Sequence, residues 1–172
     1  MSDDRGKVVV GISPSLSGLE ALRFAVAEAR RRRVTLAAVR VWSFNVGTRS
    51  RPSWEWERAL ADEARSNIAE AFRTAVGEIP ADLDVVARAL AGPSVDVALK
   101  GCVGSPYDLL VIGAARRRWW SGGVVRRCAR NAACPVVVVP PPELARVVGG
   151  RLTARRMVRE AAESLAQSAV DG

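Results

Sequence analysis

Short apolar runs, mostly of β-branched residues, alternate along the chain with stretches of helical periodicity. Runs of this kind are typical of strands in a parallel sheet, because helices cover both faces of such a sheet. The alternation predicts an α/β fold: an open five-stranded parallel sheet with helices on both faces. The expected strands are 7–12, 36–42, 83–90, 109–112 and 136–139.

The helices between these runs are expected at 16–33, 52–76 and 94–103, with about two further helical turns before the last strand. Ser15 or Ser17 can cap the first helix, and Gly77 is expected to end the second. Arg30 to Arg33 close the first helix, where cations complement the negative end of the helix dipole. We expect these arginines to form a solvated face.

For three residues inside the expected elements the pattern leaves alternative placements open. Arg40 interrupts the second strand, which predicts either a strand near the sheet edge or a guanidinium in solvent. Trp54 and Trp56 lie two positions apart at a helix start, so they face different directions. Core packing is the favoured interpretation for this pair, with at least one ring partly exposed or at an interface.

The α/β pattern occupies residues 1–142, and residues 143–172 follow a run of three prolines. Gly149 and Gly150 precede an amphipathic helical pattern from 152 to 170. We therefore expect one α/β domain followed by a linker and a C-terminal amphipathic helix. Three placements of that helix remain open: against its own sheet, against a partner subunit, or frayed.

The 172 residues include no histidine. The usual general base, the Ser-His-Asp arrangement and the commonest zinc ligand are therefore missing. Catalysis by other groups stays open on this ground alone, but we expect a protein that is not an enzyme, with no catalytic residue and no metal site. Cys102, Cys128 and Cys134 form no CxxC pair, which fits small buried residues in a reducing compartment. With no signal-peptide pattern and no apolar run of about 20 residues, we expect a cytoplasmic protein with no membrane partner.

Segments 8–29, 36–42 and 108–140 resemble the universal stress protein family, the last of them including Cys134-Pro135 before the final strand. The resemblance covers about residues 7–140. It implies a Rossmann-like domain and a stress-response function exerted by binding. It also implies a homodimer in which the last strand pairs across a two-fold axis, through Val136, Val137, Val138 and Val139. An exposed edge strand this apolar would be prone to aggregation, so its burial in a dimer interface is physically sensible.

ATP-binding members of that family carry a glycine motif after the fourth strand and a Gly-x-Asp at the end of the first. Ligands of open α/β sheets lie at these carboxyl ends of strands. In the present chain the corresponding positions of the glycine motif hold Gly113, Arg116, Arg126 and Arg127, and those of Gly-x-Asp hold Gly11 and Ser13. A side chain at a close-approach glycine blocks the backbone path to phosphate. We expect no bound cofactor, and no ATP in the family's usual manner. One alternative stays open: an anion- or nucleotide-responsive switch in which the side chains of Arg116, Arg126 and Arg127 bind the ligand.

The loop after the fourth strand is rich in arginine and tryptophan, and no acidic residue occurs from 109 to 142. Arginine beside an aromatic side chain suits an acidic protein partner with an aromatic anchor. It also suits single-stranded nucleic acid, which is less favoured than a protein partner although the net charge is +8. Other anions are a further alternative. The simplest interpretation packs Trp120 on the sheet and leaves the arginines solvated. The candidate partner-binding residues are Arg117, Arg118, Trp119 and Trp120.

Overall fold

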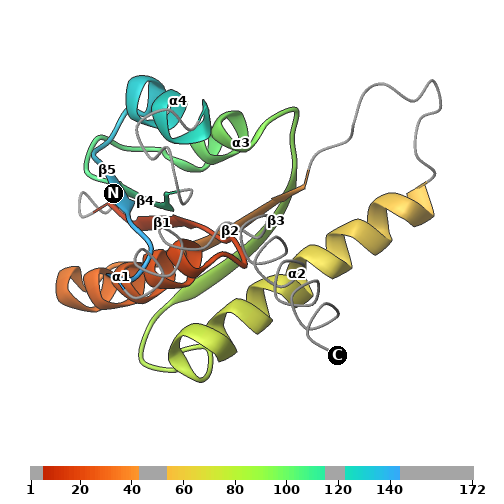
Figure 1. Ribbon diagram of the computed structural model, residues 1–172, viewed down its shortest axis with the longest axis horizontal. Coiled ribbons are helices and arrows are strands. Elements are labelled where there is room, and N and C mark those ends of the chain that lie inside the picture. Colours follow the sequence, from red (N-terminus) through yellow and green to blue (C-terminus); the bar gives the residue numbers. More distant parts are fainter. Residues whose placement is uncertain (1–5, 43–53, 115–122, 144–172) are drawn as a thin grey trace, which may run out of the picture. The chain divides into compact units, whose positions relative to one another are not determined.

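Five parallel strands form one sheet with the order β3-β2-β1-β4-β5 (Figure 1). This computed structural model describes residues 6–42, 54–114 and 123–143. The chain divides into two units, Met1–Pro141 and Pro142–Gly172, and nearly all described residues belong to the first. The strands are β1 (Val8–Gly11), β2 (Leu36–Trp42), β3 (Val85–Ala91), β4 (Leu109–Gly113) and β5 (Val136–Val139).

Helices cover both faces of the sheet. The first helices, α1 (Leu16–Arg32) and α2 (Trp54–Val76), pack on one face, while α3 (Val95–Cys102) and α4 (Gly123–Asn131) pack on the other (Figure 1). Successive strand residues point to opposite faces, so β1 supplies both cores. Val8 and Val10 join the α1–α2 core around Phe72, and Val9 joins the α3–α4 core around Leu99. This arrangement confirms the fold class expected from the apolar runs.

The ends of α1 and α2 follow from local sequence chemistry. Ser15 caps α1, since its hydroxyl accepts a hydrogen bond from the amide of Gly18 at 3.1 Å. Arg33 closes α1 in the left-handed region, with φ of 55°. Gly77 follows α2 with φ of 91°, and its amide donates to the carbonyl of Arg73. A glycine adopts this conformation without steric cost, which explains why the helix ends there.

Two placements differ from those expected. Strand β2 lies between β1 and the edge strand β3, so the alternative that placed it near the sheet edge holds. The guanidinium of Arg40 donates to the carbonyl of Ile12 at 3.1 Å and is half-buried, so its expected solvent placement is wrong. Core packing is also wrong for Trp54 and Trp56, which are 66% and 58% exposed, whereas the expected exposure of at least one ring is confirmed. They precede the buried stripe of α2, which starts only at Ala64.

The C-terminal helix expected at 152–170 lies outside the described residues. Among the helices that the structure describes, none combines the length and the apolar character needed to cross a membrane.

Candidate functional site at the carboxyl ends of the strands

The carboxyl ends of β1 and β4 lie side by side, and they bring Gly11 and Gly113 to one edge of the sheet. The register pairs Val10 with Val111, one and two residues before these glycines. Gly113 lies against the first turn of α1. A Cβ there would fall 2.6 Å from the carbonyl carbon of Ser17, which is impossible for a real side chain. Glycine at 113 is therefore required for helix–strand packing, whether or not a ligand binds.

Three serine hydroxyls form a chain at the start of α1. The hydroxyls of Ser13 and Ser15 are 3.0 Å apart, and those of Ser15 and Ser17 are 3.2 Å apart. The first turn of α1 carries no acidic residue. Ser13 thus stands at this edge where an aspartate would offer a carboxylate. Hydroxyls and helix amides can donate to an anion, but they are weak ligands for Mg²⁺ compared with a carboxylate.

Arg40 is a residue of this edge whose role the sequence did not reveal. It lines a small hollow of about 120 Å³ between α1 and α2, together with Ile12, Pro14, Leu19, Asn67, Glu70, Ala71 and Thr74. Its hydrogen bond ties the middle of the sheet to the chain that leaves β1. The only signal in the sequence was a single charge inside an apolar run.

Helix α4 carries two candidate arginines, and Arg127 is bound within the protein. Its Nε lies 2.9 Å from Oδ1 of Asp96 on α3, in the geometry of an ion pair. Asp96 is 8% exposed. Burial raises the pKa of this carboxyl, but Arg127, the backbone amide and the Ser94 hydroxyl together bring it below its ordinary value. Asp96 is therefore ionised at neutral pH and requires a cation.

Arg126 is exposed on the same helix and faces solvent without an acidic partner among the described residues. With Arg127, Arg130, Gly123 and Asn131 it lines a hollow of about 410 Å³. The neighbouring Cys128 is buried, and burial first, then the charge of Asp96, raises its thiol pKa to about 11. This thiol stays protonated at neutral pH, as expected of a core residue and not of a nucleophile. Cys102 is also buried and Cys134 half-buried.

Five of the predicted site residues lie outside the described residues: Arg116, Arg117, Arg118, Trp119 and Trp120. Of the others, the structure brings Gly11, Ser13 and Gly113 to one edge beside the start of α1. Arg126 and Arg127 lie on α4, on the sheet face that α3 shares, and Arg127 is directed to Asp96.

Strand β5 forms one edge of the sheet and pairs only with β4 within the described ranges. All four of its valines are half-buried. Val137 and Val139 pack toward the α1–α2 core, and Val136 and Val138 pack toward the α3–α4 core. The valine side chains thus pack on both faces of the sheet. The outer edge of β5 exposes backbone N–H and C=O groups that could pair with another strand.

The fold and this edge define a class of protein: a parallel α/β domain whose candidate ligand site lies where β1 and β4 end. The comparison with protein families is more specific. Residues 5–140 match the universal stress protein family, and because that match spans most of the chain, the chain belongs to this family. The comparison with curated proteins gave no match.

Solved structures share the fold. The universal stress protein from Archaeoglobus fulgidus is 22% identical, with a TM-score of 0.55 over 78% of this chain and 93% of that one. A universal stress protein in complex with cAMP is 21% identical, with a TM-score of 0.54 over 81% and 100%. The Archaeoglobus fulgidus protein in complex with dAMP is 23% identical, with a TM-score of 0.53 over 79% and 98%.

Proposed function

We propose that this chain is a stress-response protein that acts by binding, without catalysis and without ATP bound in the family's usual manner. The observation that carries the proposal is the ion pair between Arg127 and the buried Asp96. Arg127 occupies the position where the motif has a hydroxyl. A hydroxyl there would leave space and a donor for phosphate, whereas the arginine is already used to neutralise Asp96.

The first strand supports the same proposal. Ser13 replaces the aspartate of the Gly-x-Asp pattern, and its hydroxyl is already hydrogen-bonded within the serine chain. The glycine that remains, Gly113, is explained by its contact with the first turn of α1. Each of these residues has a structural role that does not need a nucleotide.

We further propose that the binding unit is a homodimer formed through β5. This apolar strand lies at a sheet edge, and such an edge is a template for pairing with another chain. An acidic protein that contacts the arginine–tryptophan loop is the partner class proposed beyond the second copy. The cell location proposed is the cytoplasm.

A second candidate function is an anion- or nucleotide-responsive switch. The hollow on α4 favours it, because Arg126 and Arg130 are exposed there and pair with no acid in the described part of the chain. Two of the similar structures hold cAMP and dAMP. In this function the side chains of α4 would bind phosphate where the family uses backbone amides.

The two functions are separated by a thermal-shift titration with ATP and magnesium at two salt concentrations. Ligand-dependent stabilisation follows affinity, and screening removes unspecific attraction to arginine. We expect no saturable shift that survives high salt. A shift at low micromolar ATP that survives salt would overturn the proposal, and its loss in Arg126→Ala would establish the switch. Arg65→Ala, which removes an exposed arginine of α2, is the matched control.

A further inference from the structure

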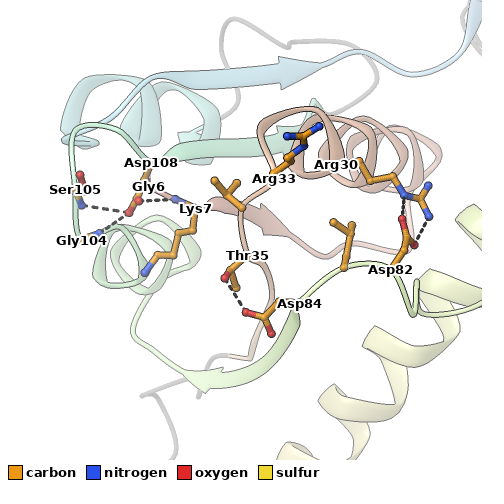
Figure 2. Close-up of a pocket in the computed structure, with 12 residues that line it drawn as sticks. Gly6, Lys7, Arg30, Arg33, Thr35, Asp82, Asp84, Gly104, Ser105 and Asp108 are labelled. Carbon is orange, nitrogen blue, oxygen red and sulfur yellow. Dashed lines mark hydrogen bonds and ion pairs between the residues drawn. The ribbon is translucent and has the colours of Figure 1, made fainter. Parts of the chain in front are cut away.

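The amino end of the sheet, opposite the carboxyl ends where the family's site lies, holds a hollow of about 770 Å³ (Figure 2). It lies where the strands begin. Its lining comes from the start of β1, the end of α1, the start of β2 and the turns before β3 and β4. A volume of this size is in the range of small-molecule sites, roughly 300–1,000 Å³. Its polar lining includes Lys7, Arg33, Thr35, Asp84 and Asp108.

Four polar residues form one row across this edge. The register aligns Val8 of β1 with Leu109 of β4 and with Leu36 of β2, and Leu36 with Val85 of β3. Each of these apolar residues is preceded by a polar one. The row directly below the buried core is therefore Asp108, Lys7, Thr35 and Asp84.

Two of the acids in the hollow are fully engaged. Asp108 is 2% exposed and accepts hydrogen bonds from the amides of Lys7, Gly104 and Ser105, at 2.9, 2.8 and 3.2 Å. Asp82 binds the guanidinium of Arg30 through both oxygens, at 2.7 and 2.8 Å. Both groups are drawn with these contacts in Figure 2. Neither of these carboxylates needs a ligand.

The charged groups of Lys7 and Arg33 have no partner within the described residues. Within the described residues the ammonium of Lys7 and the guanidinium of Arg33 form no ion pair and no side-chain hydrogen bond, although both line the hollow. Arg33 is also the only described residue other than glycine with a positive φ, at 55°. The left-handed region costs an ordinary residue about 1 kcal/mol or more. A glycine would relieve this cost, so arginine is not the residue that the backbone conformation favours at this position.

Asp84 completes the polar lining. Its Oδ2 accepts a hydrogen bond from the Thr35 hydroxyl at 2.7 Å, and the carboxylate can accept further donors. The hollow thus combines two unpaired cations with one acceptor that has capacity left.

We propose that this hollow binds a small organic anion. A carboxylate or phosphate would be held by Lys7 and Arg33 once their charged ends, which point apart in Figure 2, turn toward it. A hydroxyl or ammonium group of the same molecule would donate to Asp84. This site is separate from the carboxyl edge and does not depend on whether that edge binds a nucleotide.

The test uses the full-length protein with glycerol 3-phosphate and glycerate, which share two hydroxyl groups and differ in the anion. Amide NMR shifts during titration report where each probe binds. We expect saturable shifts at Gly6, Gly104 and Ser105 with at least one probe, at up to millimolar concentrations. The amides of Ser13 and Gly113 at the other edge should remain unchanged. The probe that binds more tightly identifies phosphate or carboxylate as the recognised group.

Two variants test the cations. Lys7→Gln and Arg33→Gly should each weaken binding about tenfold, the effect of one charge-assisted hydrogen bond. The Tm of Arg33→Gly should not fall, because glycine accepts the positive φ; a loss of binding would then not be a loss of folding. The control Arg31→Gln removes a charge at the same helix end that pairs with Glu28 and does not line the hollow. Its affinity should equal that of the wild type.

Three results would overturn the proposal: no saturable shifts with either probe, shifts confined to Ser13 and Gly113, or equal affinities for wild type, Lys7→Gln and Arg33→Gly. The second result would at the same time count against the proposed function, whereas the first and third would leave that function intact.

Discussion

Nε of Arg127 lies 2.9 Å from Oδ1 of Asp96, and this ion pair joins α4 to α3 on one face of the sheet. The aspartate is buried and the arginine is 51% exposed. A buried carboxylate that loses its cation pays for its desolvation without compensation. The residue at the family's hydroxyl position therefore has a structural task in this protein.

Replacing Arg127 with alanine should lower the free energy of unfolding by about 1 kcal/mol, a value at the low end for an unpaired buried group because the arginine is half-exposed. Urea denaturation at neutral pH measures the change. Arg126→Ala removes the same charge one position earlier, from an exposed arginine that forms no ion pair with a described acid, and should change stability by less than about 0.5 kcal/mol. Equal losses in the two variants would contradict the role given to Asp96.

The pKa of Glu28 predicts a stability change in acid. Hydrogen bonds from Arg31 and Arg32 lower it from 4.5 to about 2. A lowered pKa in the folded state adds stability above pH 4.5, and this contribution is lost as the pH falls toward 2. Glu28→Gln should lower the free energy of unfolding by about 1 kcal/mol at neutral pH, a small value because both arginines are partly exposed. Between pH 4.5 and 2 the variant should lose less stability than the wild type. The exposed Glu63→Gln on α2 is the control, and an equally steep acid loss in both variants would refute this assignment.

Two glycines allow opposite predictions for the same substitution. Gly113→Ala places a Cβ 2.6–2.7 Å from the backbone of Ser17 and Gly18, which cannot move without shifting α1. We expect a loss of about 3 kcal/mol, the upper end for overpacking. Gly101→Ala lies inside α3 with open space around the new methyl group, and alanine should add about 0.5–1 kcal/mol. Thermal or urea unfolding measures the stability of both variants. A Gly113→Ala variant as stable as the wild type would show that this close contact is absent in solution.

The sequence predicted the sheet and its helices because their signals are local. Continuous apolar runs marked the strands, and Ser15 and Gly77 marked helix ends through their own backbone chemistry. The hydrogen bond of Arg40 was not predicted because its partner, the carbonyl of Ile12, lies just beyond the end of β1 and is 28 positions away in the sequence. Trp54 and Trp56 were misplaced because the beginning of the buried stripe of α2 depends on how far the helix extends beyond the sheet.

The candidate site was predicted less completely. Gly11, Ser13 and Gly113 could be found from the motif, since their spacing follows the strand ends. The pairing of Arg127 with Asp96 could not, because the two residues lie 31 positions apart on different helices. The row of Asp108, Lys7, Thr35 and Asp84 had a signal, one polar residue before each apolar run, but it acquires meaning only with the register of the strands.

The outer edge of β5 provides the test of the proposed dimer. Residues of a strand in a parallel ladder bond alternately to one side and the other. The carbonyl of Pro135 accepts from the amide of Leu110 in β4, and the carbonyl of Val139 accepts from the amide of Ala114, directly after β4. Residues 135, 137 and 139 therefore face β4, and the amides of Val136 and Val138 face the open edge.

Val138→Pro should therefore convert a β5-paired dimer into a folded monomer, because proline is tolerated where the amide points away from the sheet and removes the donor that a second strand would use. Val137→Pro removes a bond to β4 and should instead lower the Tm strongly. Light scattering gives the mass, and circular dichroism during heating gives the Tm. If Val138→Pro stays dimeric with an unchanged Tm, the two copies associate through another surface. If the wild type is already a monomer, β5 is not an interface in solution.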